Sequence, residues 1–281
     1  MQKKRTVLVI IMGLLCILLW FPVLLMAGNS LMGEEEINTC YGAVFGNSGG
    51  WIHPRLLPQY PTLASLVKLL LDSPDFFVMF WNTVRQSGGA VIGQLVIAMP
   101  AAWAFARYEF RGRKVLFFLY VMLMILPFQV TMVSDYLVLS KLNLIDTVWA
   151  VVLPEMFSTF PVFLLYKFFK EIPQALLESA EVDGAGAFSC FWYIGIPVGR
   201  SGILACLILN LLENWNTIER PMTFLKTKAK LPLSLYFSQM TEGQIGSMFT
   251  ASLVMMIPPV LIYLWGQEYL EQGIAACGIK E

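Results

Sequence analysis

The chain has 281 residues, of which 57% are apolar and only 14% are charged, whereas soluble domains carry about 25% charged residues. Nineteen basic residues balance nineteen acidic ones, so no overall charge favours binding to nucleic acid. One histidine and five scattered cysteines form no CxxC pair and no zinc-ligand spacing, so no metal site is indicated. The apolar residues come in long blocks, which predicts an all-α integral membrane protein.

The first predicted element is a membrane span over residues 6–28, preceded by the basic sequence MQKKR at residues 1–5. A basic start followed by an apolar core also fits a signal peptide. The apolar run of about 22 residues is long enough to cross about 30 Å of hydrocarbon, and no strong cleavage site follows it. We therefore predict a retained helix whose basic start stays in the cytoplasm.

Residues 29–76 interrupt the apolar pattern with Gly, Asn, Pro and three consecutive glutamates. We interpret this segment as an extracytoplasmic loop with short helices such as 63–71. The remaining residues, 77–281, are predicted to form a core of five spans. These spans cover residues 77–106, 115–139, 147–169, 201–218 and 248–269. Small residues spaced by four in the first of them, from Gly89 to Ala106, predict a surface for close helix packing.

Basic residues indicate the side of the membrane that each loop occupies. Residues 107–114, between the second and third spans, hold four basic side chains, as cytoplasmic loops commonly do. Residues 220–230 disagree, because four basic residues there follow the fifth span and fall on the outer side. Moving them inside would place residues 170–199 outside or require an odd number of spans. We retain six spans with both termini in the cytoplasm.

Residues 170–199 form a charged, glycine-containing loop between two apolar spans. Pro173 suits the first turn of a helix, because its missing N–H needs no partner there. An apolar stripe at helical spacing follows, and Gly184 suits the left-handed position that ends a helix. A second short helix near 187–193 completes a predicted cytoplasmic helix–turn–helix that fits a cleft on another protein. A solvated connector is the alternative on these physical grounds.

The loop sequence resembles the EAA loop of binding-protein-dependent ABC importer permeases, which reads Glu-Ala-Ala, three residues, Gly, nine residues and Ile-x-Leu-Pro. The residues in register are Glu178, Ala180, Gly184, Ile194 and Pro197. Ser179 replaces the middle Ala and Ile196 replaces the Leu, which are conservative departures. The resemblance implies coupling helices that dock into ATPase subunits. The residues expected on this coupling surface are Glu178, Ser179, Ala180, Asp183, Gly184, Ile194 and Pro197.

The rest of the chain is similar to the carbohydrate-importing, maltose-type branch of this family. The similar segments are 101–107, 110–114, 126–127, 143–147, 168–173, 214–216 and 273–280. The resemblance implies the type I permease fold, with six transmembrane helices and the cytoplasmic coupling helix–turn–helix, in a bacterial cytoplasmic membrane. It implies a second homologous permease, two ATP-binding subunits and an extracytoplasmic solute-binding protein as partners, the last meeting residues 226–246. Residues 33–54 match nothing in that branch, and their role stays open.

The chain holds no GxxxxGK[ST] phosphate loop and no nucleophile beside a base, so we predict a transport subunit without a catalytic site or a bound cofactor. Partner subunits would use ATP. The expected function is ATP-driven import of a sugar or related polyol. The alternatives are a permease for another solute such as glycerol phosphate, an ion-driven secondary transporter, and a non-transporting scaffold or sensor. A secondary transporter would show inverted repeats and acidic relays at mid-membrane, and neither is evident.

Polar residues within the spans are candidates for the translocation pathway. A charge at the bilayer centre costs about 2.5–3.5 kcal/mol on insertion scales, so such groups normally face the bundle interior or water. Hydrogen bonding between helices or exposure at the interface is the alternative for each. We expect the pathway to be lined by a cluster near the end of the fifth span: Glu213, Asn214, Trp215 and Asn216. The other polar candidates within the spans are Asn82, Arg85, Gln94, Gln129, Asp135, Glu155 and Asn210.

Overall fold

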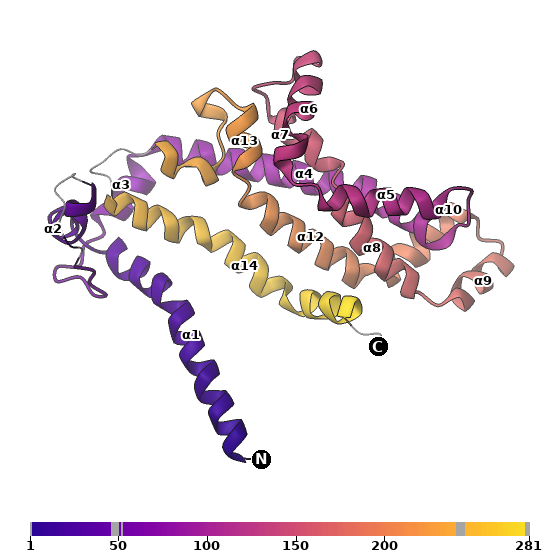
Figure 1. Cartoon of the computed structure of the whole chain (residues 1–281), viewed down its shortest axis with the longest axis horizontal. Helices are drawn as coiled ribbons and strands as arrows, with labels where there is room; N and C mark the ends of the chain where they lie inside the picture. The colour runs from indigo at the N-terminus through magenta and orange to yellow at the C-terminus, as the bar shows by residue number, and fades with distance from the viewer. Residues whose placement is uncertain (1, 46–50, 52, 240–244, 279–281) are drawn as a thin grey trace. The chain divides into compact units, whose positions relative to one another are not determined.

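The structure is a computed structural model that describes residues 2–45, 51, 53–239 and 245–278, and all its regular elements are helical (Figure 1). Among the described residues, four helical segments are long and apolar enough to cross a membrane. Two bent helix pairs add two further spans if each pair is counted as one. The chain is therefore an all-α, multi-pass membrane protein, as the sequence predicts.

The candidate spans follow the order predicted from the sequence, although their ends differ. The unbent spans are α1 (Gln2–Ser30), α4 (Pro74–Arg107), α7 (Val148–Met156) joined to α8 (Phe160–Glu171), and α14 (Ile245–Gly278). The first bent pair is α5 (Arg113–Ile125) with α6 (Phe128–Lys141), and it has a bend of 103°. The second runs from α10 (Ala187–Ser189) through η1 (Cys190–Gly195) and α11 (Ile196–Val198) to α12 (Arg200–Trp215), with a bend of 72°.

The bend between α5 and α6 departs from the continuous third span that the sequence predicts. Pro127 causes it, because proline has no N–H to donate and its ring disfavours helical backbone at the preceding residue. That residue, Leu126, has a ψ of 122°, which is extended backbone, and α6 begins directly after Pro127. The third predicted span is therefore two helices that run in different directions.

The described residues form two compact units, and the first combines residues up to Phe77 with 236–258. It contains two short helices of the predicted extracytoplasmic loop, α2 (Glu34–Phe45) and α3 (Ala64–Leu71), the second of which matches the predicted helix 63–71. Its core consists of Met32, Ile37, Cys40, Tyr41 and Ile245. The division into residues 1–28, 29–76 and 77–281 describes membrane topology rather than packing, and it stays a prediction.

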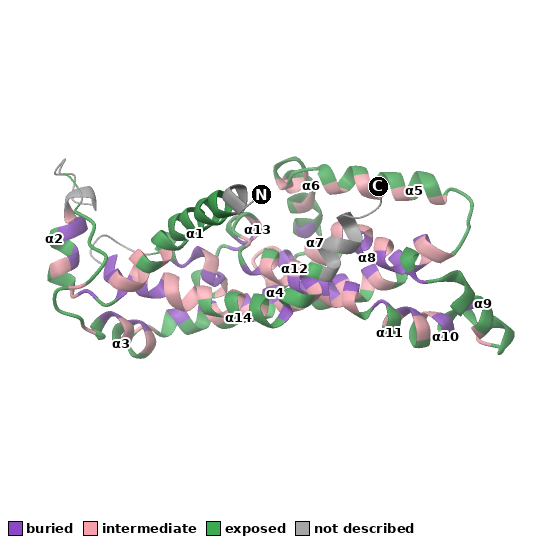
Figure 2. Cartoon of the chain, turned by 90° about the horizontal axis from the view of Figure 1, so that it is seen from below, coloured by how far each residue is buried: buried purple, intermediate pink, exposed green. Residues whose placement is uncertain are grey.

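Helix α1 leaves a long apolar surface uncovered. Every residue from Thr6 to Pro22 is exposed, which Figure 2 shows as an almost unbroken green ribbon. A contiguous apolar surface of this size requires lipid or another protein chain to cover it. The helix therefore contributes little to the internal packing of the chain and is available to its surroundings.

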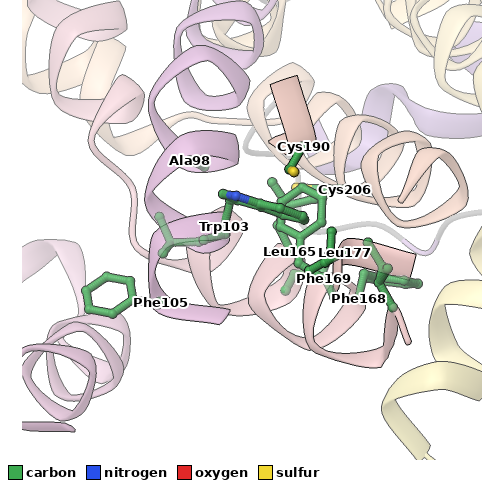
Figure 3. Packing of buried hydrophobic residues seen from close by; sticks show 13 residues of the cluster. Ala98, Trp103, Phe105, Leu165, Phe168, Phe169, Leu177, Cys190 and Cys206 are labelled. Carbon is green, nitrogen blue, oxygen red and sulfur yellow. The ribbon is translucent and has the colours of Figure 1, made fainter. Parts of the chain in front are cut away.

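The second unit comprises residues 78–235 and 259–281. Its core lies where α4 and α8 meet the loop after α8, and Figure 3 shows the packing. The Trp103 ring stands edge-on to Phe169 with the ring centroids 5.4 Å apart. Phe105 points away from the other labelled residues and packs on Phe117, at 5.6 Å between centroids. Leu177 and Cys190 belong to the same core, so the predicted coupling loop is fastened to the membrane helices.

The small residues of α4 are a packing surface, as their four-residue spacing predicts. A Cβ atom placed on Gly89 would lie 3.4 Å from the side chain of Val152. On Gly93 it would lie 2.3 Å from Met156, a distance that no real Cβ contact reaches. The contact at Gly89 is an ordinary one, whereas the missing side chain at Gly93 gives the Met156 side chain of α7 room against α4.

Candidate functional site

The predicted coupling loop forms a helix–turn–helix, with α9 (Gln174–Val182) followed by the turn and by α10 to α11 (Figure 1). Helix α9 begins directly after Pro173 and ends in a Schellman motif, a paired set of backbone hydrogen bonds that closes a helix C-terminus. The N–H of Gly184 donates to Glu181 at 3.0 Å, and the N–H of Ala185 donates to Ala180 at 2.9 Å. Gly184 has a φ of +85°, the left-handed conformation that its position requires.

One face of the loop is buried against the membrane core. Leu177 and Cys190 are buried, and Ala180 and Ile194 are half-buried and pack on the same cluster. Ala180 and Ile194, which the sequence places on the coupling surface, thus attach the loop to the membrane helices. The other residues expected on that surface are exposed: Glu178, Ser179, Asp183, Gly184 and Pro197. The coupling role of all seven stays a prediction.

The opposite face carries exposed apolar side chains, here called the loop patch: Val182, Phe188, Trp192 and Tyr193. Val182 is 88% exposed, Phe188 is 74% exposed and Tyr193 is 75% exposed. The Phe188 and Trp192 rings stack with their centroids 6.1 Å apart. Such a patch requires lipid or another protein chain to cover it, which is not expected of a solvated connector. Sequence reasoning missed these residues, although the four-residue spacing of Phe188 and Trp192 puts both rings on one helical face.

Arg107, at the end of α4, fastens the start of the loop. Its guanidinium donates to the carbonyl oxygens of Phe169 and Ile172, and one nitrogen lies 3.5 Å from the side-chain oxygen of Gln174. The guanidinium carbon also lies 5.6 Å from the centroid of the Trp103 ring. These contacts satisfy carbonyl groups at the C-terminal end of α8, where a helix lacks internal partners. They join α4, α8 and the start of α9.

A cavity of about 500 Å³ lies among α6, α7, α12 and α13 (Glu219–Phe224). Its apolar wall includes three aromatic rings, from Phe128, Phe157 and Phe160. Hydroxyl and charged side chains share the rest of the wall: Thr131, Ser134, Asp135, Ser158, Thr159, Glu213 and Arg220. This combination of ring faces and hydrogen-bonding groups suits a small polar solute.

An ion-paired arginine holds the polar wall of this cavity together. Arg220 Nε lies 2.6 Å from Glu155 Oε1, and Arg220 Nη1 lies 3.5 Å from Asp135 Oδ2. The guanidinium also lies 5.0 Å from the centroid of the Phe128 ring. Arg220 is one of the four basic residues that the predicted topology places on the outer side, against the usual bias of basic residues toward cytoplasmic loops. The structure shows that its guanidinium pairs with two carboxylates. Its two carboxylate partners come from other helices, so no local sequence pattern reveals the cluster.

The four residues that the sequence assigns to the pathway lie in different surroundings. Glu213 lies on the wall of the 500 Å³ cavity. Asn214 lines a separate, much smaller pocket of about 10 Å³ and donates to the Asn210 carbonyl. Trp215 is buried edge-on to Phe80, and Asn216 is exposed and donates to the carbonyl of Leu212. Only Glu213 of the four reaches the larger cavity, and the lining role stays a prediction for all of them.

The segment that follows α13 is held to α4 by side-chain hydrogen bonds to its backbone. Asn82 donates to the carbonyls of Ala229 and Leu231 at 2.7 and 3.1 Å, and Gln86 donates to Lys230 at 3.0 Å. Leu231, Leu233 and Leu235 of this segment are buried. Asn82, a pathway candidate in the sequence, therefore positions this loop.

Asp146 fixes the other side of the same loop. Its carboxylate accepts hydrogen bonds from the backbone N–H groups of Lys226 and Thr227, both at 2.9 Å, and from the Thr227 hydroxyl at 2.6 Å. The ammonium of Lys230 lies 2.9 Å away. These donors hold the pKa of Asp146 well below its usual range, with the Thr227 hydroxyl the largest cause. The carboxylate is therefore charged, and holds the loop, throughout the neutral range.

Replacing Asp146 with alanine should release this loop. Three lysines, at 226, 228 and 230, make the segment a substrate for trypsin, so we expect tryptic cleavage there to become severalfold faster. The effect of Asp146→Asn should be small, because an asparagine oxygen still accepts from the backbone donors and asparagine tolerates the φ of 59° at this position. Because the pKa of Asp146 is depressed, the wild-type loop should lose its protection from trypsin only at acidic pH. That protection should stay constant between about pH 6 and 8. Equal cleavage of the alanine variant and the wild type would show that Asp146 does not hold the loop.

Residues 94–276 match the family model described as "Binding-protein-dependent transport system inner membrane component". The arabinooligosaccharides transport system permease protein AraQ of Halalkalibacterium halodurans is 27% identical over 226 residues, which cover 79% of this chain and 81% of AraQ. A putative ABC transporter permease of Caldicellulosiruptor sp., ORF2, is 30% identical over 229 residues, with 80% and 82% covered. The sn-glycerol-3-phosphate transport system permease protein UgpE of Yersinia enterocolitica is 27% identical over 208 residues, with 72% and 74% covered.

Two solved structures share the fold. A chain of a bacterial ABC transporter involved in the import of the acidic polysaccharide alginate matches with a TM-score of 0.80 at 20% identity, covering 95% of this chain and 96% of that one. A chain of the bacterial alginate ABC transporter in complex with an alginate pentasaccharide-bound periplasmic protein matches with a TM-score of 0.67 at 16% identity, with 94% of each chain covered. At these identities the likeness shows the fold alone.

Proposed function

The chain belongs to the family of inner-membrane components of binding-protein-dependent transport systems, the permeases of ABC importers, and we propose that it helps to import a neutral sugar or related polyol at the expense of ATP. The observation that carries this proposal is the coupling loop, because it has one face fastened to the membrane core and an apolar patch on the other. This arrangement suits a subunit that is moved by a separate ATPase, because it links a docking surface to the membrane helices.

The coupling loop would pass the motion of ATP-binding subunits to the membrane helices. The loop patch would dock into the ATPase, while Leu177 and Ala180 fix α9 to the core that contains Trp103 and Phe169. A displacement of α9 is then a displacement of α4 and α8, because close-packed cores shift as units. ATP stays on the partner subunits, and this chain needs no cofactor of its own.

The remaining proposed partners are those that the family resemblance implies. A second, homologous permease would complete the pathway, two ATP-binding subunits would bind the coupling loops, and a solute-binding protein would meet the outer loop. The exposed Lys226 and Lys228 support that last contact, because they offer positive charge to an acidic partner. The basic start of the chain and the basic residues 107–114 support a topology with both termini in the cytoplasm.

The chemistry of the 500 Å³ cavity supports a neutral solute. Three carboxylates lie at this cavity with one guanidinium, that of Arg220: Asp135 and Glu213 line its wall, and Glu155 is ion-paired to Arg220. Carboxylates accept hydrogen bonds from sugar hydroxyls, and the aromatic rings offer faces to a sugar ring. An anion would meet like charge, and one carboxylate about 6 Å away disfavours it by about 3 kcal/mol at an effective dielectric constant of about 20.

This argument separates the two solute classes that relatives of the chain handle. AraQ is named for arabinooligosaccharides, whereas UgpE is named for sn-glycerol 3-phosphate. A permease whose cavity is adapted to a phosphate ester would be expected to present an excess of basic groups. The excess here is acidic, so the neutral class fits better.

The complex, purified from mild detergent with its ATPase and binding protein and placed in proteoliposomes, should accumulate its solute only when ATP is supplied. Neutral oligosaccharides should be taken up, and sn-glycerol 3-phosphate should not. Glu213→Gln should lower sugar uptake severalfold, because it weakens a hydrogen-bond acceptor on the cavity wall. Glu268→Gln is the matched control, because it makes the same chemical change at an exposed residue outside the cavity, and its uptake should stay near wild type.

Three results would contradict this proposal. Uptake that persists without ATP but follows an ion gradient would indicate a secondary transporter. ATPase binding without any solute flux would indicate a scaffold. Uptake of glycerol phosphate in preference to neutral sugars would overturn the solute class and leave the ATP-driven mechanism standing.

A further inference from the structure

A second cavity, of about 700 Å³, lies beside the start of α5. Its wall is formed by the turn between α4 and α5, the first turns of α5, and two residues of α8, Tyr166 and Lys170. Two aromatic rings also line it, those of Phe110, which precedes α5, and Phe117, which lies in α5. The cavity is large enough for the headgroup of a lipid and too open to serve as packing.

The charges around this cavity are unbalanced. Arg113, Lys114 and Lys170 line it, against the single carboxylate of Glu109. Within the part of the chain that the structure describes, none of these three cations forms an ion pair. The nearest attractive partner of the Lys170 ammonium is the Tyr166 ring, 5.7 Å from nitrogen to centroid. Three unpaired cations around one hollow repel each other, and a bound anion would relieve that repulsion.

The cavity lies where the charged loop gives way to an apolar helix surface. Helix α5 begins at Arg113, and within two turns it exposes Val115, Leu116, Phe118 and Leu119, by 63, 47, 62 and 48%. Basic residues followed at once by exposed apolar ones mark the level at which a bilayer changes from headgroups to acyl chains. The anion most concentrated at that level is the phosphate of a phospholipid.

We propose that this cavity binds the headgroup of an anionic phospholipid. Arg113, Lys114 and Lys170 would contact the phosphate, and the acyl chains would lie along the exposed apolar face of α5. Basic pockets between membrane helices suit such headgroups. The proposed topology decides only which leaflet supplies the lipid, and the chemistry of the pocket stands without it.

The site also lies next to the coupling loop. Lys170 is four residues ahead of the first residue of α9, and the carbonyls of neighbouring Phe169 and Ile172 are held by Arg107. A lipid bound to Lys170 would therefore restrain the segment through which the loop joins α8. Loss of the lipid should reduce the ATP-driven uptake of the assembled importer as well as its lipid content.

The test uses the intact importer in nanodiscs that contain phosphatidylcholine with a minor fraction of phosphatidylglycerol, and counts retained lipids by native mass spectrometry. Wild type should retain phosphatidylglycerol in preference to phosphatidylcholine. Lys114→Gln/Lys170→Gln should retain it about tenfold less. The matched control is Arg111→Gln/Lys141→Gln, which removes the same charge from exposed positions outside the cavity, and it should retain phosphatidylglycerol as wild type does. Lys114→Arg/Lys170→Arg should restore retention and shows that folding is intact.

Three outcomes would overturn the proposal. Equal lipid loss from the cavity variant and the control would mean that only the total charge matters. Unchanged lipid retention in the cavity variant would mean that the pocket holds no headgroup. Displacement of the retained phosphatidylglycerol by inorganic phosphate at about 10 mM would assign the pocket to free phosphate instead of lipid. None of these results bears on ATP dependence, so failure here is distinguishable from failure of the importer function.

Discussion

Replacing Gly184 with valine should abolish solute uptake while the assembled complex continues to hydrolyse ATP. Gly184 has a φ of +85°, where a side chain with a Cβ costs about 1–2 kcal/mol and a β-branched one more. The chain would leave the left-handed conformation, and the two hydrogen bonds that end α9 would be lost. The loop patch would then no longer keep its position relative to the core. We expect uptake to fall at least tenfold.

A valine at Gly186 provides the matched control. Gly186 lies two residues further along the same turn, and a Cβ there also meets no atom within 4 Å. Its φ of −75° is one that valine adopts without strain. Gly184→Asn is a second control, because asparagine tolerates the left-handed region. Both should transport, and coupled transport at the wild-type rate in Gly184→Val would remove the basis for the docking role. The readout is ATP hydrolysis and uptake in the same proteoliposomes.

Gly202→Ala should destabilise the membrane core, although it adds only one methyl group. Gly202 lies in α12 against the ring of Phe168, and a Cβ there would lie 2.2 Å from the nearest ring atom. Phe168 is itself buried, so the ring has little room to move. Overpacking of this kind costs about 1–3 kcal/mol, which exceeds the gain of about 1 kcal/mol in helix propensity. The midpoint of thermal unfolding in mild detergent should fall by several degrees.

Gly88→Ala makes the same chemical change where nothing opposes it. A Cβ on Gly88, inside α4, would meet no atom within 4 Å. The gain in helix propensity then has no packing cost to offset it, so stability should stay the same or rise slightly. A pair of variants with shifts of the same sign would show that helix propensity, and not the Phe168 contact, governs the response.

The sequence predicts the coupling loop well, because its signals are local. Pro173 and Gly184 each constrain the backbone at one residue, and in the structure α9 begins directly after Pro173 and ends two residues before Gly184. The residues that close the 500 Å³ cavity carry no such signal. Arg220 pairs with Glu155 and Asp135, which are distant from it in the sequence and are brought close only by the packing of α6, α7 and α13. Contacts between distant segments depend on the whole fold, which no short pattern encodes.

Two predictions show the limit of local reasoning. Glu213 to Asn216 are consecutive in the sequence, but successive residues of a helix turn by about 100°, and the structure places only Glu213 of the four on the 500 Å³ cavity. The lining role stays a prediction for all four. Proline is ambiguous as well, because Pro100 and Pro154 lie inside continuous helices whereas Pro127 separates two. Which of these prolines breaks a span depends on tertiary contacts.

Helix α4 has a mechanical consequence, because two loops attach to it near its opposite ends. Near one end, Asn82 and Gln86 hold the loop that would face the solute receptor. At the other end, Arg107 holds the loop that would face the motor. The roughly 25 intervening residue steps span about 38 Å, more than the hydrocarbon thickness of about 30 Å. Receptor docking should therefore change the rate of nucleotide turnover even when no solute occupies the pathway.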